Sequence, residues 1–522
     1  MSNETFRVIG LPDTQKYSER YPEVFRAQTQ WIVDNQEALD IEFVSHYGDL
    51  VKHGTGPLVQ HGTGPLAQQE YENAEAAMQL LRVANVPHGM VAGNHDVLET
   101  GSVGQPYDNG NYLEYFGPHW YGDRDWFGGA SPSGLSTYQY FEGNGTEFLA
   151  LHLDLETPHA ELAWAQEIIN ENRDKPVMVT THRYLQDAEE YTAGVPIVPS
   201  GRYPEIWYTI EGQYSPDGIR AEEFFNHFVA TNRNIFLVNV GHFHEEYRQT
   251  SVNVHGLPVH EVLADYQDAP NGGNGYLRIM EFDTAGDRIN VTSYSPTLDN
   301  FLTKDESQFN LAVDFDRYVA PNPTVYFQNG VGDYQGTQDT WINETSKNRS
   351  YGNNSTLVAD DDTTNSWWRD REGQTLLKFD DIIGSEAGQI PLGATITQAS
   401  LKLTLKDDID HPFYNPDFDV YYMTRDWNES STWNALGGGL SVNSDYDELI
   451  NTFAGDNDPD GYDIRHVDVR EAVQRWADGE MNYGFGIISE TIRGNDDGID
   501  LFASEASQIM FRPALEVEFT LV

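Results

Sequence analysis

Five short apolar runs in the first half of the chain each lead into a motif that contains aspartate or histidine. The runs and their motifs are 6–11 with Asp13-Thr14-Gln15, 41–44 with Gly48-Asp49, 86–92 with Gly93-Asn94-His95-Asp96, 177–179 with His182, and 235–240 with Gly241-His242-Phe243-His244. Each run has the length of a β-strand and ends at a candidate ligand. The pattern therefore predicts that the ligands gather along one edge of a sheet and form a metal site.

Helical patterns alternate with these runs. Apolar residues recur on one face at helical spacing in four stretches, which contain Val24, Phe25, Trp31, Ile32 and Leu39; Ala74, Met78 and Leu81; Leu162, Ala165, Ile168 and Ile169; and Phe224, Phe225 and Phe228. Alternating strands and helices predict a layered α/β architecture with its site at the strand ends.

Two longer segments, 97–137 and 184–220, do not fit this alternation, and each follows a candidate ligand. Loops of this length are usually lids or binding loops. Their aromatic residues either line a substrate cleft or pack the loops down; they are Tyr107, Tyr112, Tyr115, Trp120, Tyr121, Tyr184, Tyr191 and Trp207.

The order of the motifs resembles that of the calcineurin-like metallophosphoesterase family over residues 5–315. The resemblance implies an αββα fold, with two facing sheets flanked by helices. It also implies a phosphoester hydrolase, a phosphodiesterase or a phosphomonoesterase, in which a hydroxide bridges two divalent metal ions. We expect this domain to span residues 1–318, followed by a linker at 319–323 and a second domain at 324–522.

The resemblance also implies a role for each candidate ligand. It assigns the metal bridge to Asp49, one metal to Asp13, Gln15 and His244, and the other metal to Asn94, His182 and His242. Gln15 replaces the family's commoner histidine and is typical of an Asp-Thr-Gln subgroup. Its amide oxygen is a harder ligand than a ring nitrogen, which shifts the preference from zinc toward manganese, iron or magnesium.

His95 and Asp96 are the candidate catalytic residues. An imidazole beside the metals is suited to protonating the leaving oxygen, and Asp96 would then hold its ring in place. The alternatives are an electrostatic clamp on phosphate for His95 and a turn-stabilising hydrogen bond for Asp96.

A tandem duplication follows Asp49. Residues 50–57 and 58–65 are identical except that Lys52 in the first copy corresponds to Gln60 in the second. The histidines of the two copies, His53 and His61, are either further ligands or part of a loop insertion without a catalytic role.

From Thr324 onward the chain consists of short apolar runs separated by polar turns, interrupted by one helical pattern at 469–476. This pattern predicts an all-β, jelly-roll-like sandwich. The segments 376–380, 399–403, 427–434, 473–476, 482–485 and 502–505 resemble the DNRLRE-type carbohydrate-binding modules. The resemblance implies that this domain anchors the chain to a glycan or a cell-surface polysaccharide.

An acidic stretch in the second domain is a candidate calcium loop. Asp456, Asp458 and Asp460 alternate ahead of Gly461, as at the start of an EF-hand. Position twelve is Val467 rather than glutamate, which excludes a true EF-hand. The alternative is a solvated loop.

Charge limits the partners. The 83 Asp and Glu residues outnumber the 31 Lys and Arg residues, for a net charge of −52. At molar salt the screening length falls to about 3 Å, so this composition is typical of a halophilic protein; the alternative is an acidic secreted protein. No basic run is present to neutralise many phosphates, which excludes bulk nucleic-acid binding but not a small phosphoester substrate.

The chain has no cysteine and no apolar window of membrane-spanning length, and its polar first residues predict no signal segment. The family resemblance nevertheless predicts an extracellular or cell-surface location, with a virion-associated or cytoplasmic one as the alternative. The competing function is a surface or virion-associated binding or structural protein whose phosphoesterase fold has little or no activity.

Overall fold

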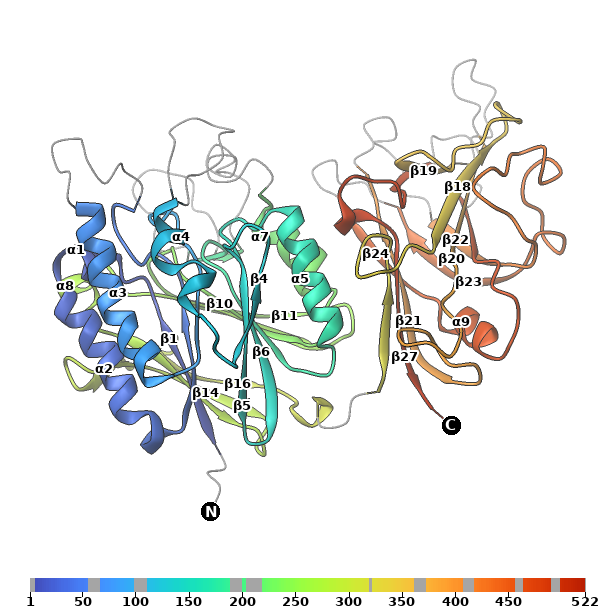
Figure 1. Cartoon of the computed structure of the whole chain (residues 1–522). Coiled ribbons are helices and arrows are strands. Elements are labelled where there is room, and N and C mark those ends of the chain that lie inside the picture. Colours follow the sequence, from blue (N-terminus) through green and yellow to red (C-terminus); the bar gives the residue numbers. More distant parts are fainter. Residues whose placement is uncertain are drawn as a thin grey trace. The chain divides into compact units, whose positions relative to one another are not determined.

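The computed structural model describes residues 5–54, 66–97, 110–187, 200–202, 218–318, 322–360, 372–406, 417–455, 463–489 and 498–521. The chain divides into two compact units, Met1–Pro321 and Asn322–Val522. Figure 1 shows both units, with the first coloured from blue to yellow-green and the second from yellow to red.

Two sheets form the centre of the first unit. The first sheet contains, in spatial order, β15 (Asn300–Phe301), β14 (Arg288–Ser295), β13 (Leu277–Asp283), β1 (Phe6–Leu11), β2 (Ile41–His46) and β3 (His88–Met90), while β16 (Gln308–Ala312) pairs with β14. The second contains β11 (Glu245–Val252), β12 (Pro258–Asp265), β10 (Ile235–Val240), β7 (Val177–Thr180), β6 (Thr146–His152), β5 (Thr137–Gly143) and β4 (Phe127–Ala130). Strands β1 to β3 run parallel to one another, as do β6, β7, β10 and β12.

Helices cover the outer faces of these sheets. They are α1 (Gln15–Arg20), α2 (Pro22–Leu39), α3 (Leu66–Ala84), α4 (Gly110–Phe116), α5 (His159–Glu171), α7 (Ala221–Phe224) with the π-helix η4 (Phe225–Val229), and α8 (Pro270–Gly273). In Figure 1, α1 to α3 lie on one side of the unit and α5 and α7 on the other. Short 3-10 turns occur at η1 (Pro118–Trp120) and η5 (Asp316–Tyr318), and β8 (Leu185–Gln186) pairs with β9 (Gly201–Arg202).

Two buried clusters hold the layers together. Phe25 of α2 and Met78 of α3 pack with Val44 of the first sheet. Between the sheets, Phe6 of β1 packs against Phe148 of β6, with ring centroids 5.4 Å apart. The order is therefore helix, sheet, sheet, helix, which confirms the predicted fold class of the first domain.

The second unit is built from antiparallel sheets. One contains β17 (Thr324–Phe327), β27 (Ala514–Thr520), β21 (Thr395–Thr404) and β24 (Ile464–Asp468), and another contains β18 (Thr337–Asn343), β20 (Gly373–Phe379), β25 (Phe485–Ser489), β22 (Asp417–Met423) and β23 (Tyr446–Ala454). A small sheet pairs β19 (Thr356–Ala359) with β26 (Ile499–Phe502), and α9 (Arg470–Ala477) and η6 (Ile509–Phe511) complete the unit.

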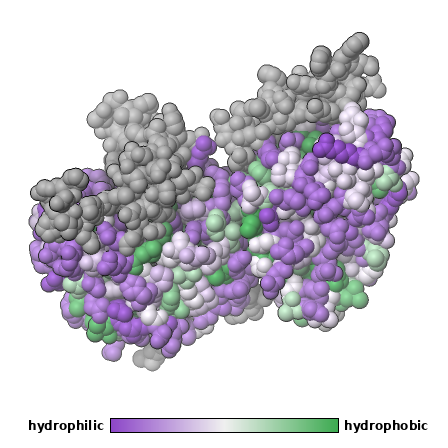
Figure 2. Space-filling view, turned by 45° about the horizontal axis from the view of Figure 1, so that its top comes forward, coloured by the Kyte–Doolittle hydropathy of each residue, from purple (hydrophilic) through white to green (hydrophobic). Residues whose placement is uncertain are grey.

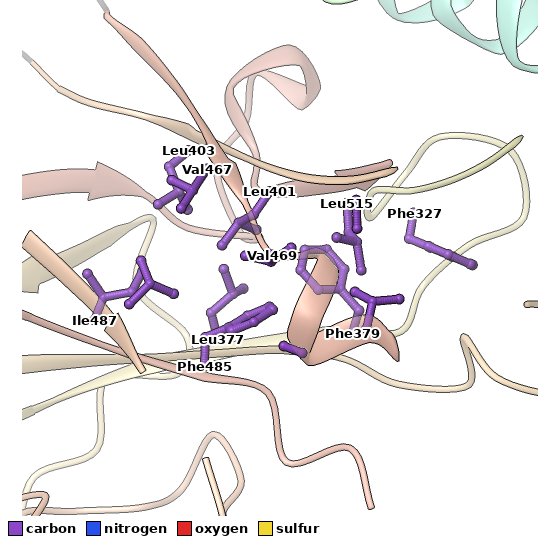
Figure 3. Packing of buried hydrophobic residues seen from close by; sticks show 14 of the residues in the cluster. Phe327, Leu377, Phe379, Leu401, Leu403, Val467, Val469, Phe485, Ile487 and Leu515 are labelled. Atoms are coloured by element: carbon purple, nitrogen blue, oxygen red, sulfur yellow. The ribbon is translucent and has the colours of Figure 1, made fainter. Parts of the chain in front are cut away.

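Apolar side chains from the two larger sheets meet in the core of this unit. Figure 3 shows Leu377 and Phe485 of one sheet facing Leu401 and Leu515 of the other. Trp476 of α9 also packs there, with its ring centroid 5.2 Å from that of Phe485. Two antiparallel sheets packed face to face form a β-sandwich, as the sequence predicts.

The face of the molecule shown in Figure 2 is mainly hydrophilic. Figure 2 shows that hydrophilic residues cover most of the described surface on the face in view, whereas hydrophobic ones form small separate spots. No described helix combines the length and the hydropathy that a membrane-spanning segment needs.

A lysine is buried in the β-sandwich. Lys402 of β21 is 4% exposed, and its Nζ donates a hydrogen bond to the carbonyl of Met510 at 2.6 Å. Burial lowers the pKa of Lys402 from 10.5 to about 7. Between these two pH values the unfolded chain therefore holds a proton that the folded one has released.

We expect the free energy of unfolding of the second unit to rise between pH 7 and pH 10, by about 1 kcal/mol per pH unit at most. Lys402→Met should be more stable than the parent at pH 7 and should lack this slope, because nothing titrates at that position. Urea unfolding at several pH values measures the slope, and Lys406→Met is the matched control. An identical slope in the parent and Lys402→Met would contradict the prediction.

Candidate metal centre

The candidate ligands follow the aligned ends of parallel strands in both sheets. In the first sheet Leu11 pairs with His46, and His46 pairs with Met90. In the second sheet Thr180 pairs with Asn239. The ligand motifs that follow therefore come together between two sheets. The expectation of a single sheet edge is corrected, because the sequence periodicity does not show to which sheet each strand belongs.

Two carboxylates and one imidazole form the centre of this cluster. Ligand atoms of Asp13, Asp49 and His182 all lie within 4.8 Å of one another, and all three side chains are buried. His182 Nδ1 donates to the carbonyl of Tyr47 at 2.7 Å, and its Nε2 lies 3.4 Å from Asp49 Oδ1. The hydrogen bond from Nδ1 to Tyr47 orients the ring so that Nε2 faces the cluster, as in histidines that bind metals.

The side chain of Asn94 contacts two histidines of this cluster. Its Oδ1 lies 2.8 Å from His242 Nδ1 and 3.2 Å from His182 Nε2. In the neutral tautomer that donates to Tyr47, His182 Nε2 carries a lone pair that faces the lone pairs of this oxygen. Either a proton on Nε2 or a metal cation is needed between them. The structure thus brings together the three residues predicted for one metal.

Gln15, the first residue of α1, lies on the other side of Asp49. Its Nε2 donates to Asp49 Oδ2 at 2.8 Å, which fixes the orientation of the amide. Its Oε1 is buried and has no hydrogen-bond partner among the described residues. A buried polar atom without a partner costs about 1–3 kcal/mol. A divalent cation, for which an amide oxygen is an ordinary ligand, fits this position.

His244 contacts acidic residues that the sequence analysis did not select. Its Nδ1 lies 2.6 Å from Asp268 Oδ2, and its Nε2 lies 3.9 Å from Asp265 Oδ2. Asp265 ends β12, is 1% exposed and accepts hydrogen bonds from the backbone and side chain of Gln267. Asp265 links His244 to Asp13, because its charge raises the pKa of Asp13. The apolar run 262–264 precedes Asp265 just as apolar runs precede the predicted ligands, so the sequence shows the same pattern at this residue.

Glycines let the strand-end loops approach one another closely. A Cβ at Gly93 would lie 2.1 Å from Asp49 Oδ1, and one at Gly241 would lie 2.2 Å from Asp13 Oδ1. A side chain at either position would displace the aspartate carboxylate, and at Gly93 it would also lie 2.4 Å from the backbone nitrogen of Asp49, so these positions of the two motifs favour glycine. In addition, Asp49 and His242 have φ angles of 51° and 73°. Left-handed backbone at such residues is sparsely populated and clusters at functional sites.

The imidazole of His95 lies beside this cluster and is held by Lys52. Its Nδ1 lies 3.0 Å from the carbonyl of Lys52, and its Nε2 lies 3.1 Å from Lys52 Nζ. The backbone N–H of His95 donates to Asp49 Oδ1 at 2.9 Å. A carbonyl only accepts, so Nδ1 carries the proton and Nε2 faces the ammonium.

Asp96 is buried among backbone groups rather than against the His95 ring. Its carboxylate accepts hydrogen bonds from the N–H groups of Gly93, Leu50 and Val51, at 2.8–3.1 Å. These bonds tie the loop after β2 to the loop after β3. The structure thus places Asp96 where the sequence analysis allowed a turn-stabilising role.

Several buried carboxylates lie close together in the site, so negative charge is concentrated there. Burial and the charges of Asp265 and Asp49 raise the pKa of Asp13. Burial raises the pKa of Asp265 to about 6, and burial together with Asp49 raises the pKa of Asp96 to about 7. Burial also acts to raise the pKa of Asp49, but the charge and hydrogen bond of His182 together with the charges of His95 and His242 hold that pKa below the ordinary value. Divalent cations would relieve this repulsion.

Other sequence candidates lie away from the cluster or outside the described residues. His53 Nδ1 pairs with Glu70 Oε1 at 2.8 Å, so it is turned toward α3. Tyr112, Trp120, Tyr121 and Tyr184 are buried, which favours packing over substrate contact. Some of the sequence candidates fall outside the described part of the chain. They are His61, Tyr107, Tyr191, Trp207 and the candidate calcium ligands Asp456, Asp458 and Asp460.

Two family models match the chain. Residues 6–246 match calcineurin-like phosphoesterases, and residues 332–519 match carbohydrate-binding module family 96. Both resemblances predicted from the motifs are confirmed at this level. The DNRLRE assignment and the halophilic interpretation stay predictions.

One curated relative and two solved structures were compared with the chain. The uncharacterized protein YvnB of Bacillus subtilis (strain 168) is 29% identical over 344 residues, 63% of this chain and 23% of that protein, so the chain spans less than a quarter of its length. GAP50, the anchor in the inner membrane complex of Plasmodium, is 10% identical with a TM-score of 0.31, covering 60% of this chain and 93% of that one. An isomalto-dextranase of Arthrobacter globiformis T6 complexed with panose is 9% identical with a TM-score of 0.17, covering 98% and 96%.

Proposed function

Because residues 6–246 are a calcineurin-like phosphoesterase domain and residues 332–519 a carbohydrate-binding module, we propose that the chain hydrolyses small phosphoesters at a glycan-bearing surface outside the cell. In this reaction water adds to phosphorus, the bond from phosphorus to the leaving oxygen breaks, and the leaving alcohol takes up a proton. The family implies divalent metal ions for this chemistry.

The side chains of the cluster fit two such ions. Asp49 would hold both ions, because its Oδ1 lies near His182 and its Oδ2 accepts from Gln15. When bound, divalent cations polarise the phosphoryl oxygens and lower the pKa of a water molecule toward neutrality. Manganese, iron, zinc and magnesium remain the candidates, and the amide oxygens of Gln15 and Asn94 favour the harder ions.

The proposed proton donor to the leaving oxygen is His95 in its imidazolium form, because the neutral ring has no proton on Nε2, which accepts from Lys52 Nζ. The bond to the Lys52 carbonyl fixes the plane of its ring, and the bond from its N–H to Asp49 fixes its distance from the proposed bridge. Asp96 positions both loops through its three backbone bonds. These contacts hold the general acid in place before substrate binds.

The buried, unpartnered Oε1 of Gln15 beside the Asp13, Asp49 and His182 cluster carries this proposal. The test is p-nitrophenol release from a phosphate monoester and a diester in molar salt, with manganese supplied and a chelated sample alongside. Metal-dependent release is expected. Bound metal without release from either ester would favour the competing function, a surface-associated binding protein with an inactive phosphoesterase fold.

The β-sandwich contains a polar groove suited to a neutral glycan. The groove has a volume of about 570 Å³, and amides, hydroxyls and one carboxylate line it, among them Gln338, Asn353, Asn428, Ser430 and Glu429. Its described lining contains no lysine or arginine that would select an acidic polysaccharide. Amide and hydroxyl groups instead match the donors and acceptors of sugar hydroxyls. We therefore propose that this groove binds the glycan.

We expect the double variant Gln338→Ala, Asn353→Ala to weaken retention on a neutral polysaccharide by about 10-fold, the effect of losing one or two neutral hydrogen bonds. Affinity electrophoresis of the full chain in gels with neutral or acidic polysaccharides measures this. Ester hydrolysis should not change. Asn451→Ala, on β23 and outside the groove lining, is the control. Equal retention of the double variant and the parent would contradict the assignment of the groove.

A further inference from the structure

Lys52 presents an ammonium group beside the metal centre. It lies three residues after Asp49, and its Nζ is 3.1 Å from His95 Nε2. The backbone N–H of Lys52 donates to the buried Glu70 carboxylate at 2.8 Å, and its carbonyl accepts from the His95 ring. The lysine is therefore held at both ends, by its backbone and by its amine.

Within the described part of the chain the charge of Lys52 has no carboxylate partner, unlike that of the cations nearby. Lys16 pairs with Asp268 at 2.7 Å, and Arg183, the neighbour of His182, pairs with Glu156. Among the described residues, no carboxylate lies within ion-pair distance of Lys52, although the chain is strongly acidic. An unpaired cation at an acidic site is suited to binding an anion.

Phosphate monoesters and diesters differ in the oxygens that they offer to such a cation. A monoester has three non-bridging oxygens and carries up to two negative charges, whereas a diester has two non-bridging oxygens and one charge. If two non-bridging oxygens were bound by the two proposed cations, a third would remain for Lys52 only in the monoester. In a diester, this third position carries the second organic group, which an ammonium does not stabilise.

We propose that Lys52 binds this third oxygen and makes the site a phosphomonoesterase. The inference rests on the proposed function, and it names the substrate class that the catalytic motifs leave open. Lys52 and His95 then act on neighbouring oxygens of one phosphoryl group, because their side-chain nitrogens are 3.1 Å apart. Lys52 is thus a specificity-determining residue.

The duplicated segment supplies a mild substitution to test this. Residues 58–65 repeat residues 50–57 with Gln60 in place of Lys52, so the chain itself carries glutamine in the same local sequence. Lys52→Gln removes the charge and keeps a long polar side chain. Lys52→Arg keeps the charge and is the rescue variant. Lys175→Gln, two residues before β7 and paired with Glu147, is the matched control.

With manganese-loaded full chain, we expect the parent to prefer the monoester in kcat/KM. Lys52→Gln should lower the monoester value by about 10- to 100-fold, the factor for one hydrogen bond to a charged group, and the diester value by less than about 3-fold. Lys52→Arg should restore most of the monoester kcat/KM that Lys52→Gln loses, and Lys175→Gln should match the parent on both esters. A parent that prefers the diester would overturn the inference, as would an equal loss on both esters in Lys52→Gln.

Binding of inorganic phosphate separates this inference from the proposed function. Calorimetry on the manganese-loaded proteins should show an affinity about 10-fold lower in Lys52→Gln, with an unchanged metal content. If the parent hydrolyses neither ester, the proposed function fails, yet weaker phosphate binding by this variant would still support anion binding by Lys52. Equal phosphate affinity in the parent and Lys52→Gln would overturn the role of Lys52 whatever the activity.

Discussion

Asp49→Asn is expected to reduce metal-dependent ester hydrolysis on the order of 1,000-fold, as does the loss of one charge-stabilising group from an active site. Asparagine preserves the shape of the side chain but removes its charge and one acceptor oxygen. The carboxylate of Asp49 accepts from Gln15 Nε2 and the His95 N–H and lies 3.4 Å from His182 Nε2. The Asp49 side chain therefore contacts Gln15, which is predicted for one metal, and His182, which is predicted for the other.

Elemental analysis should accompany the kinetics of Asp49→Asn, because we expect bound metal to fall with activity. Asp40→Asn is the control, since Asp40 ends α2 in a left-handed conformation that asparagine also adopts readily. Circular dichroism establishes that both variants are folded. Full metal content together with parental kcat in Asp49→Asn would show that hydrolysis does not depend on this carboxylate.

The order of motifs along the chain is sufficient to predict the α/β fold and the approximate place of the site. Parallel strands end at the same edge of their sheet, so a residue such as Asp13 or His182 falls near its counterparts whatever the loop lengths. The glycines at Gly93 and Gly241 strengthen this signal, because they are required only where another side chain comes close. Local sequence therefore contains much of the information about the site.

Contacts that depend on tertiary packing are not predictable in this way. Asp265 follows an apolar run, but a single aspartate after a strand is an ordinary capping residue, and only the pairing of β12 with β10 brings it to the site. Lys52 lies in a repeat whose second copy carries Gln60, and nothing in the sequence shows that its side chain meets His95. The conformation of the loop after β2 determines that Lys52 contacts the His95 ring.

In the β-sandwich, too, the strands are predictable from the sequence, whereas contacts that depend on tertiary packing are not. Alternating apolar residues such as Leu401 and Leu403 predict the strands and their inner face. Lys402 lies between them, and the alternation places it on the opposite, solvent-facing side. In the structure it is buried because η6 supplies the carbonyl of Met510 over that face. The polar groove likewise depends on how the loops come together, which periodicity does not describe.

Glu246→Ala is expected to destabilise the first unit by about 3–5 kcal/mol, the cost of leaving a buried charge without its partner. Glu246 lies in β11, two residues after His244, and its Oε1 is 2.7 Å from Arg278 Nη2. The hydroxyls of Tyr266 and Ser293 donate to the same oxygen, each at 2.7 Å. Arg278 is fully buried, so the substitution would leave its guanidinium without a counter-charge.

Burial opposes ionisation of Glu246, but the charge of Arg278 and the hydrogen bonds from Ser307, Ser293 and Tyr266 together outweigh burial and lower the pKa of Glu246 below the ordinary value of 4.5. A carboxylate with a depressed pKa stabilises the folded state above its unfolded value, and this stabilisation is lost as the pH falls through the folded value. We therefore expect acid to destabilise the parent more steeply than Glu246→Gln below pH 4.5.

Urea unfolding of the full chain with and without manganese measures the effect of Glu246→Ala. The control is Glu147→Ala, because its exposed pair with Lys175 should contribute about 1 kcal/mol or less. Metal affinity should fall as well, since β11 begins directly after His244 and is tied to β13 through Arg278. If Glu246→Ala and Glu147→Ala had equal free energies of unfolding, this buried ion pair would not hold the second sheet against the first, and the position of His244 would have to be fixed by β12 alone.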